Sequence, residues 1–138
     1  MGEVSVFLGR GDGSFKSPVS YSPRGCGAVV AVAVADLNGD GNPDLALADN
    51  CTSGEVIILL GNGDGTFQAP QSYASGAFIA TSVAVGDFNG DGKIDLAVGH
   101  VTANGTVSTG VVSVLIGNGD GPFKLRVFTL LELVVLPP

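Results

Sequence analysis

The sequence predicts an all-β protein built from repeated units of four antiparallel strands. Two observations support this fold class. The stretch "VAVADLNGDGNPDLALAD" begins at residue 32, and the similar stretch "VAVGDFNGDGKIDLAVGH" begins at residue 83, 51 residues later. Within both stretches apolar residues alternate with a period of two, which is typical of strands and not of helices. The 138 residues include 22 glycines, and Val, Ala and Leu supply most of the apolar content, as suits short strands joined by tight turns.

The first strand of the unit is predicted from "AVVAVAVAD", residues 28–36, where valines alternate with alanines. One face of this strand is bulky and the other is small, which predicts a strand covered on both faces with one closely packed neighbour. The acidic stretch that follows is a loop, and the second strand returns from it. These second strands are "DLALAD" at residues 44–49 and "DLAVGH" at residues 95–100.

The third strand is strongly apolar and the fourth is polar. The third is predicted from "VSVFLG", "EVIILLG" and "VVSVLIG", and each copy ends at a turn of the "GNGDG" kind. The fourth, in "SFKSPVSY" and "TFQAPQSY", contains a proline that marks it as an edge strand. Four antiparallel strands at a period of about 50 residues predict the blade of a β-propeller.

The repeats divide the chain into four predicted parts. Residues 1–23 end a preceding repeat, residues 24–74 and 75–124 are two full repeats, and residues 125–138 are a divergent tail. "VTANGTVSTG" is an insertion that we interpret as a lengthened loop. The tail is either a truncated or frameshifted terminus or a strand that completes a blade. About two and a half repeats cannot close a propeller of four to eight blades, so we expect open blade edges and exposed apolar faces. The predicted partners are therefore other blades, from the same longer chain or from further copies.

The acidic loops are candidate calcium sites. Read from Asp36, oxygen-bearing side chains fall at alternate positions, as in the first half of an EF-hand loop, but Leu47 stands where an EF-hand has its bidentate Glu. A returning strand, not a helix, follows this loop, so the carboxylate of Asp44 can close it instead. Gly41 and Gly92 allow the backbone to double back. The alternative is a glycine-rich turn in which Asp and Asn only cap backbone groups.

The pattern D-x-N-G-D-G-x-x-D followed by "LLGNGDGTFQAP" resembles the FG-GAP or VCBS repeats of bacterial secreted proteins, which are related to the integrin α-subunit propeller. The resemblance covers roughly residues 3–124. It implies a partial β-propeller, normally of seven blades, with one structural Ca²⁺ between the first and second strands of each blade. The implied ligands are the side chains of Asp36, Asn38, Asp40 and Asp44 with the carbonyl of Asn42, and in the second loop Asp87, Asn89, Asp91 and Asp95 with the carbonyl of Lys93. Three carboxylates without a bidentate ligand predict weak sites, with Kd of roughly 0.1–1 mM.

The net charge of −7 favours a cation as partner and argues against nucleic acid. The longest apolar stretch, residues 125–136, is too short and too charged to span a bilayer, so no membrane insertion is expected. The start of the chain shows no signal peptide and only a poor match to a myristoylation site.

Three further features of the sequence bear on function: the two cysteines, an Arg-Gly-Asp tripeptide and the single histidine. Cys26 and Cys51 flank the first strand pair, so they are either a disulfide, as in an oxidising exterior, or two free thiols. The Arg-Gly-Asp tripeptide in "GRGDG" replaces the "GNGDG" turns of the other copies, and its Asp12 is expected to form a turn, as are Asp64 and Asp120. His100, the only histidine, is expected to be a solvated residue at a strand end, and no catalytic constellation is found.

These observations predict a non-enzymatic, calcium-binding propeller segment of an extracellular or cell-surface protein that acts as a scaffold for adhesion or ligand binding. A protein or a carbohydrate is the expected ligand. Two alternatives stay open: the non-catalytic propeller part of a secreted hydrolase or a sugar-binding lectin, and a truncated fragment without a function of its own. A cluster of exposed aromatic residues on one propeller face would favour a lectin, but only Tyr21 and Tyr73 offer themselves, and both fall in predicted outer strands. Ligand identity, parent chain length and oligomeric state are not determined by the sequence.

Overall fold

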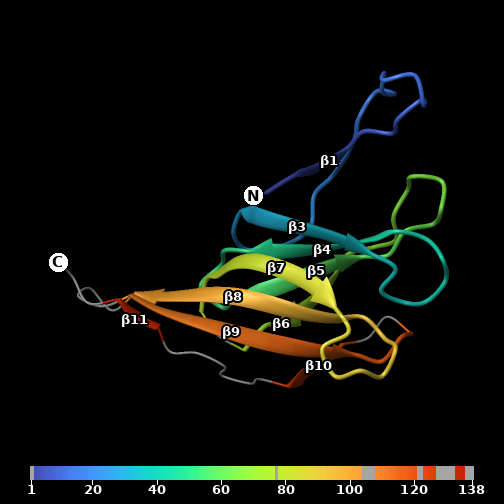
Figure 1. Cartoon of the computed structure of the whole chain (residues 1–138). Helices are drawn as coiled ribbons and strands as arrows, with labels where there is room; N and C mark the ends of the chain where they lie inside the picture. Colours follow the sequence, from blue (N-terminus) through green and yellow to red (C-terminus); the bar gives the residue numbers. More distant parts are fainter. Residues whose placement is uncertain (1, 77, 104–107, 121–122, 127–132, 136–138) are drawn as a thin grey trace.

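The fold consists of antiparallel β-sheets. The computed structural model describes residues 2–76, 78–103, 108–120, 123–126 and 133–135, and these residues form strands and turns without a helix. Two four-stranded arrangements lie next to each other, and a two-stranded sheet projects from one of them (Figure 1). The predicted all-β, propeller-like repeat fold is confirmed. The described residues include no helix that could cross a membrane.

The first blade is a sheet of four strands in sequence order. It contains β3 (Val29–Ala35), β4 (Asp44–Asp49), β5 (Glu55–Leu59) and β6 (Gln71–Ala74), each antiparallel to its neighbour. Every residue of β4 is buried, because this strand is paired on both edges and covered on both faces. β6 is an edge strand of this sheet and begins directly after Pro70, as the proline in the sequence predicted.

The second blade repeats this order. It contains β7 (Ala80–Gly86), β8 (Asp95–Ala103), β9 (Ser108–Gly117) and β10 (Phe123–Arg126). A further strand, β11 (Leu133–Val135), pairs with β9 near its start, beyond the stretch that β10 occupies. The tail thus places residues 125–126 and 133–135 in strands of this sheet.

The insertion after the second blade's β8 is not simply a lengthened loop. β8 has nine residues where β4 has six, and pairing with β9 continues through Thr102↔Thr109 to Ala103↔Ser108. Threonine and valine favour strands, so the inserted residues extend the hairpin on both sides. Residues 104–107 lie outside the described residues.

The half-blade is the pair of strands before the first blade. β1 (Val4–Val6) pairs with β2 (Val19–Tyr21), and in the described part of the chain β1 has no other partner strand. The residues "GEV" at 2–4 and again at 54–56 show that β1 and β2 correspond to β5 and β6, 52 residues later. The half-blade is therefore the outer half of a repeat.

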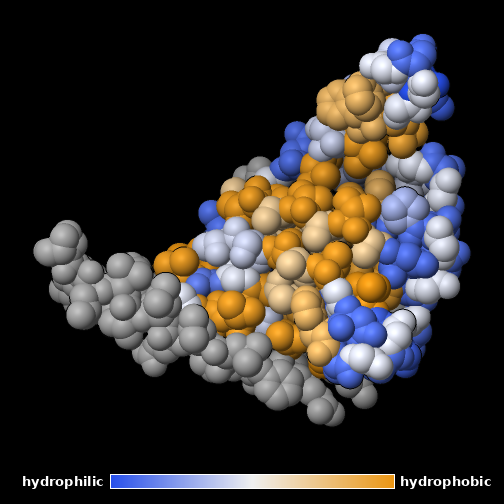
Figure 2. Space-filling model, in the orientation of Figure 1, coloured by the Kyte–Doolittle hydropathy of each residue, from blue (hydrophilic) through white to orange (hydrophobic). Residues whose placement is uncertain are grey.

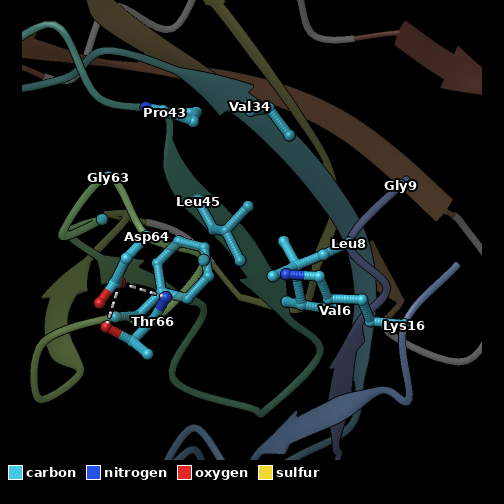
Figure 3. Close-up of a pocket in the computed structure, with 13 residues that line it drawn as sticks. Val6, Leu8, Gly9, Lys16, Val34, Pro43, Leu45, Gly63, Asp64 and Thr66 are labelled. Atoms are coloured by element: carbon cyan, nitrogen blue, oxygen red, sulfur yellow. Dashed lines mark hydrogen bonds between the residues drawn. The ribbon is translucent and has the colours of Figure 1, made fainter. Parts of the chain in front are cut away.

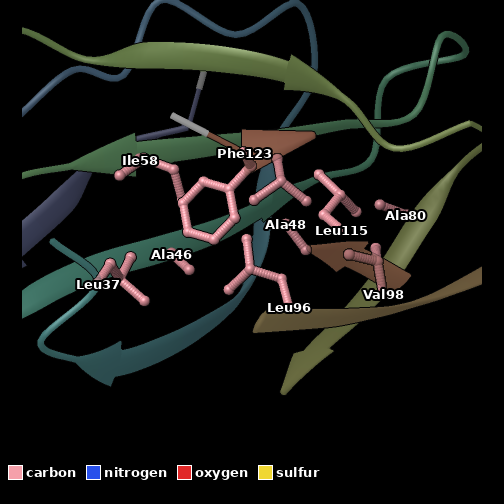
Figure 4. Close-up of a cluster of buried hydrophobic side chains, with 10 residues drawn as sticks. Leu37, Ala46, Ala48, Ile58, Ala80, Leu96, Val98, Leu115 and Phe123 are labelled. Atoms are coloured by element: carbon pink, nitrogen blue, oxygen red, sulfur yellow. The ribbon is translucent and has the colours of Figure 1, made fainter. Parts of the chain in front are cut away.

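The main core lies between the two blades (Figure 4). Small alanines of β3 and β4 face larger side chains of β7, β8 and β9, so the sheets approach closely. The buried members are Leu37, Ala46, Ala48, Val56 and Ile58 from the first blade with Ala80, Leu96, Val98, Leu115 and Phe123 from the second. The small face predicted for the first strand of the unit thus lies at the contact between the blades, which is its closely packed neighbour.

The opposite face of the first blade is covered only in part. Leu45, Leu47, Ile57 and Leu59 form a second buried cluster under the half-blade. Val32 and Val34 of β3 remain 49% and 56% exposed. The expectation that this strand is covered on both faces is therefore wrong for the face that carries Val32 and Val34, because the half-blade has two strands and does not reach over β3.

A disulfide joins Cys26, which precedes β3, to Cys51, which follows β4, with a Cα–Cα distance of 5.4 Å. Of the two alternatives left by the sequence, the structure has the bonded form. Cross-linking two segments 25 residues apart restricts the unfolded chain and fixes the end of the blade opposite the acidic loops.

Candidate functional site

Two acidic loops occupy equivalent positions in the two blades. The first connects β3 to β4 and contains residues 36–44, and the second connects β7 to β8 and contains residues 87–95. Both project from the same end of the sheets (Figure 1). Gly41 and Gly92 have φ of 85° and 82°, a left-handed conformation that lets the chain reverse as the sequence predicted.

The first aspartate of each loop organises the backbone. The N–H groups of Gly39 and Asp40 donate to Asp36 Oδ1 at 2.8 and 3.1 Å, and the N–H of Gly41 donates to Asp36 Oδ2 at 2.8 Å. A carboxylate that accepts three backbone hydrogens is held in one orientation. Asp36 is consequently fixed at the start of the loop.

The middle of the first loop is a chain of side-chain acceptors. The N–H of Asp40 also donates to Asn38 Oδ1 at 3.1 Å, and the N–H of Asn42 donates to Asp40 Oδ1 at 2.8 Å. The Asn38 amide donates to Asp40 Oδ2 at 3.0 Å. Side-chain oxygens at alternate positions therefore all turn into the same tight loop.

The second loop has the same network. Asp87 accepts hydrogen bonds from the N–H groups of Gly90, Asp91 and Gly92 at 2.7, 3.1 and 2.8 Å. Asn89 accepts from the N–H of Asp91 at 3.1 Å, and Asp91 accepts from the N–H of Lys93 at 2.9 Å. The two loops differ in sequence at positions two, seven and eight, yet every described backbone-to-side-chain contact is repeated.

The last aspartate of each loop is buried and performs a different task. Asp44 is 0% exposed, and it accepts the N–H of Leu37 at 2.8 Å and the N–H of Gly61 at 2.7 Å. It thereby ties its own loop to the end of β5. Asp95, also 0% exposed, makes the same bonds to the N–H groups of Phe88 and Gly117, both at 2.9 Å.

Sequence reasoning missed this second connection. The predicted role of Asp44 and Asp95 was that of a loop-closing ligand, and the bond to the third strand was not foreseen. The signal is present: a glycine ends the third strand in every copy. A Cβ on Gly61 would lie 2.2 Å from the carbonyl oxygen of Pro43, and one on Gly117 would lie 2.0 Å from that of Ile94. Only glycine allows the strand end to approach the loop so closely.

The donor set fits a hard divalent cation. Each loop offers carboxylate and amide oxygens, which are the ligands of Ca²⁺. Oxygens around one Ca²⁺ at about 2.4 Å each lie within about 4.8 Å of one another. Among the described residues the three carboxylates of a loop do not gather within 4.8 Å. The residues present therefore fit the ion in kind and order, and binding requires the side chains to draw together.

Hydrogen bonds lower the pKa of one exposed carboxylate in each loop. The pKa of Asp40 is lowered, first by the N–H of Asn42 and then by the Asn38 amide. The pKa of Asp87 is lowered chiefly by the N–H of Gly92. Both groups are therefore charged at neutral pH, which is the state that binds a cation.

One further cluster has metal-ligand atoms close together: Cys26, Cys51 and Glu55. Both sulfurs belong to the disulfide, so they are not thiolate ligands. This cluster is not a metal centre.

The "GNGDG" turns are stabilised by their own aspartates. Asp12 Oδ1 accepts the N–H and the hydroxyl of Ser14 at 2.9 and 2.6 Å, and Asp64 Oδ1 does the same with Thr66 at the same distances. The prediction that both residues form turns is confirmed. In the Arg-Gly-Asp tripeptide the carboxylate of Asp12 is thus engaged within its own turn.

His100 is buried, so the expectation of a solvated residue is wrong. It is 2% exposed, its Nδ1 lies 2.9 Å from the carbonyl oxygen of Phe78, and its Nε2 has no hydrogen-bond partner within the described part of the chain. It occupies the repeat position of Asp49, which is also buried. The carbonyl of Phe78, which lies between β6 and β7 in the sequence, contacts this strand end, a tertiary contact that the sequence did not indicate.

Burial lowers the pKa of His100, so the folded protein holds this residue neutral. The unfolded chain takes up a proton near pH 6.5, and stability is therefore expected to fall as the pH is lowered from 7 to 5. The slope is at most about 1.4 kcal/mol per pH unit, because one proton is involved. Urea unfolding of wild type and His100→Asn at several pH values tests this. If the variant keeps the same slope between pH 5 and 7, His100 is not its source.

Comparison with known protein families identifies the family of the repeats. A family model described as an FG-GAP-like repeat matches residues 1–47 and 37–98. No curated protein matches the chain, and no solved structure matches it. The first match includes the half-blade and the whole first acidic loop, and the second match includes residues 37–44 of that loop and the whole second acidic loop.

Proposed function

We propose, on the premise that this chain belongs to the FG-GAP-like repeat family, that it is a calcium-binding β-propeller repeat segment that serves as an extracellular or cell-surface scaffold. Each acidic loop would hold one structural Ca²⁺. The ligands would be Asp36, Asn38, Asp40, Asp44 and the carbonyl of Asn42 in the first blade, and Asp87, Asn89, Asp91, Asp95 and the carbonyl of Lys93 in the second.

The observation that carries the calcium proposal is the repeated network. Two loops with different sequences at the intervening positions keep the same side-chain acceptors in the same contacts. Each loop holds three carboxylates within nine residues, and their hydrogen bonds to backbone N–H groups keep the three negative charges close together. Bound Ca²⁺ would offset the repulsion among three carboxylates and fix the loop on its hairpin.

A non-catalytic role is proposed for the same chain, in keeping with a repeat family that is typically non-catalytic. His100, the one histidine and so the residue type best suited to proton transfer near neutral pH, is buried with Nδ1 directed at a backbone carbonyl. It is therefore not placed to act on a substrate.

An extracellular location and a protein or carbohydrate ligand complete the proposal. The disulfide supports an oxidising compartment. A lectin finds less support, because the two tyrosine rings pack edge-to-face on Phe67 and Phe123 at 5.3 and 5.7 Å. Both tyrosines are half-buried, so each offers only part of its ring for a sugar to stack on.

Calcium is expected to raise the thermal stability of the chain. At Kd of about 0.1–1 mM, a tenfold excess stabilises by about 1.4 kcal/mol per site, so two sites should raise Tm by about 5–10 °C. Thermal unfolding with millimolar CaCl₂ and with EDTA, together with molecular mass, measures the effect. The double variant Asp40→Ala/Asp91→Ala should lose the rise.

Asp64→Ala is the matched control, because Asp64 is an exposed aspartate of a glycine-rich turn outside the acidic loops. It should lower Tm slightly and keep the response to calcium. A calcium response that survives in the double variant, or disappears in Asp64→Ala, contradicts the assignment of the sites.

A further inference from the structure

The half-blade sits on the first blade as the outer strands of the first blade sit on the second. Tyr21 of β2 packs on Phe67 with ring centroids 5.3 Å apart and planes at 84°. Tyr73 of β6 packs on Phe123 at 5.7 Å and 82°. In the first blade, β5 and β6 share a sheet with the inner strands β3 and β4. Since β1 and β2 correspond to β5 and β6, a complete repeat would have two such inner strands beside β1. The described residues contain no strands in that position.

The surface next to the half-blade is more exposed than the equivalent surface between the two blades. Val83 and Val85 of β7 are partly buried because they pack against the inner strands of the first blade. The corresponding Val32 and Val34 of β3 are exposed. Figure 2 shows an apolar area over the strands beside the projecting segment. We call this surface, formed by Val32, Val34, Leu45 and the free edge of β1, the valine face.

Gly9 supplies a second and independent observation. It corresponds to Gly61 and Gly117, where a Cβ would collide with a loop carbonyl at 2.2 and 2.0 Å. A Cβ on Gly9 would meet nothing within 4 Å. β1, the counterpart of the third strand of a blade, is thus followed by the same glycine although no loop of the described residues approaches it. This is a place for the backbone of an incoming loop.

A pocket lies where that loop would enter. It has a volume of about 490 Å³, and Figure 3 shows Val34, Leu45, Leu8 and Gly9 around it. The corresponding place between the two blades is filled by Leu37, which is 1% exposed and shares a buried cluster with Leu96 and Phe123. Leu37 is the second residue of its acidic loop. The pocket therefore fits the apolar second residue of another such loop.

We propose that the valine face is a docking site for a two-stranded β-hairpin of another FG-GAP-like repeat. The hairpin would pair with the free edge of β1, place small side chains on the valines, insert the apolar residue of its D-x-N-G-D-G loop into the pocket and direct its final aspartate at the N–H of Gly9. This inference rests on the blade architecture of the proposed function but not on calcium.

The occupant is a hairpin and not a whole blade of a second copy. The second blade carries β9 and β10 beside its inner strands. On the valine face these outer strands would fall where β1 and β2 already lie. A partner with two strands completes the half-blade without displacing it, by adding strands to an open sheet edge.

Binding of a synthetic hairpin tests the proposal. The probe is a peptide with the sequence of residues 28–50, which contains both inner strands and their loop. Isothermal titration into the full chain should show saturable 1:1 binding. The same peptide with Leu37→Asp should bind at least tenfold more weakly, because its loop residue cannot enter the apolar pocket.

Variants of the full chain separate docking from folding. Gly9→Val should leave Tm nearly unchanged, since its Cβ position is empty and its φ is not in the left-handed region, yet it should weaken peptide binding at least tenfold. Gly110→Val, another open strand position, is the matched control and should bind normally. Equal binding by wild type and Gly9→Val would overturn the proposal.

If the isolated peptide does not fold, the same hairpin can be tested as an N-terminal extension of the chain. Residues 27–52, with Cys51→Ser in the copy, are duplicated directly before Met1, which keeps the 52-residue register. Tm should rise by at least about 5 °C, and Gly9→Val should cancel the rise. No binding and no rise would overturn the proposal while leaving the calcium test unaffected. A wild-type dimer that Gly9→Val dissociates would identify a second copy as the occupant and would overturn the hairpin.

Discussion

Asp44→Ala is expected to destabilise the chain by about 3 kcal/mol even in the absence of calcium. The substitution leaves the N–H groups of Leu37 and Gly61 without their acceptor inside the protein. Each unsatisfied buried donor costs about 1–3 kcal/mol, and the tie between the loop and β5 is lost as well. Denaturant unfolding in EDTA gives the free-energy difference directly.

The control for this prediction is Asp40→Ala in the same loop. Asp40 is exposed and accepts hydrogen bonds only from its own loop, so in EDTA its loss should cost less than about 1 kcal/mol. With calcium present, the cost of Asp40→Ala should grow, because a ligand is missing from the bound state. If both variants lose the same stability in EDTA, Asp44 has no separate structural role.

Val56→Ala is expected to cost about 2–3 kcal/mol, whereas Val32→Ala should cost less than about 1 kcal/mol. Val56 is 0% exposed in the cluster between the blades, and its truncation leaves a cavity there. Val32 is 49% exposed on the valine face and loses little on truncation. The two changes remove the same atoms, so their difference reports burial alone.

Urea unfolding of both variants measures this difference. A cost for Val32→Ala as large as that for Val56→Ala would mean that the valine face is already covered in solution, for instance by self-association. Repeating the measurement over a range of protein concentrations distinguishes self-association from a covered monomer.

The strands were predictable because their signal is local. The alternation of valine and alanine places β3 correctly, and a 52-residue offset relates β1 and β2 to β5 and β6. Which face is covered depends on the neighbouring strands, so the exposure of Val34 did not follow from the pattern. The strand extension through Thr102 and the burial of His100 likewise depend on tertiary pairing.

In the candidate site, too, the local contacts were predictable and the contacts between distant strands were not. The spacing of Asp36, Asn38 and Asp40 identified the loop and its acceptors, because these contacts form within a few residues. The bond from Gly61 to Asp44 spans 17 residues and forms only when β5 returns beside the loop. Such a contact becomes visible in the sequence only when the glycine and the aspartate are compared across the repeats.

Calcium binding at equilibrium tests the central claim most directly. Equilibrium dialysis of the full chain against millimolar Ca²⁺ should give two ions per chain, one in Asp40→Ala, one in Asp91→Ala and none in the double variant. Asp64→Ala should still bind two. A wild-type chain that binds no calcium, or variants that bind as much as wild type, would contradict the claim that the two acidic loops are calcium sites.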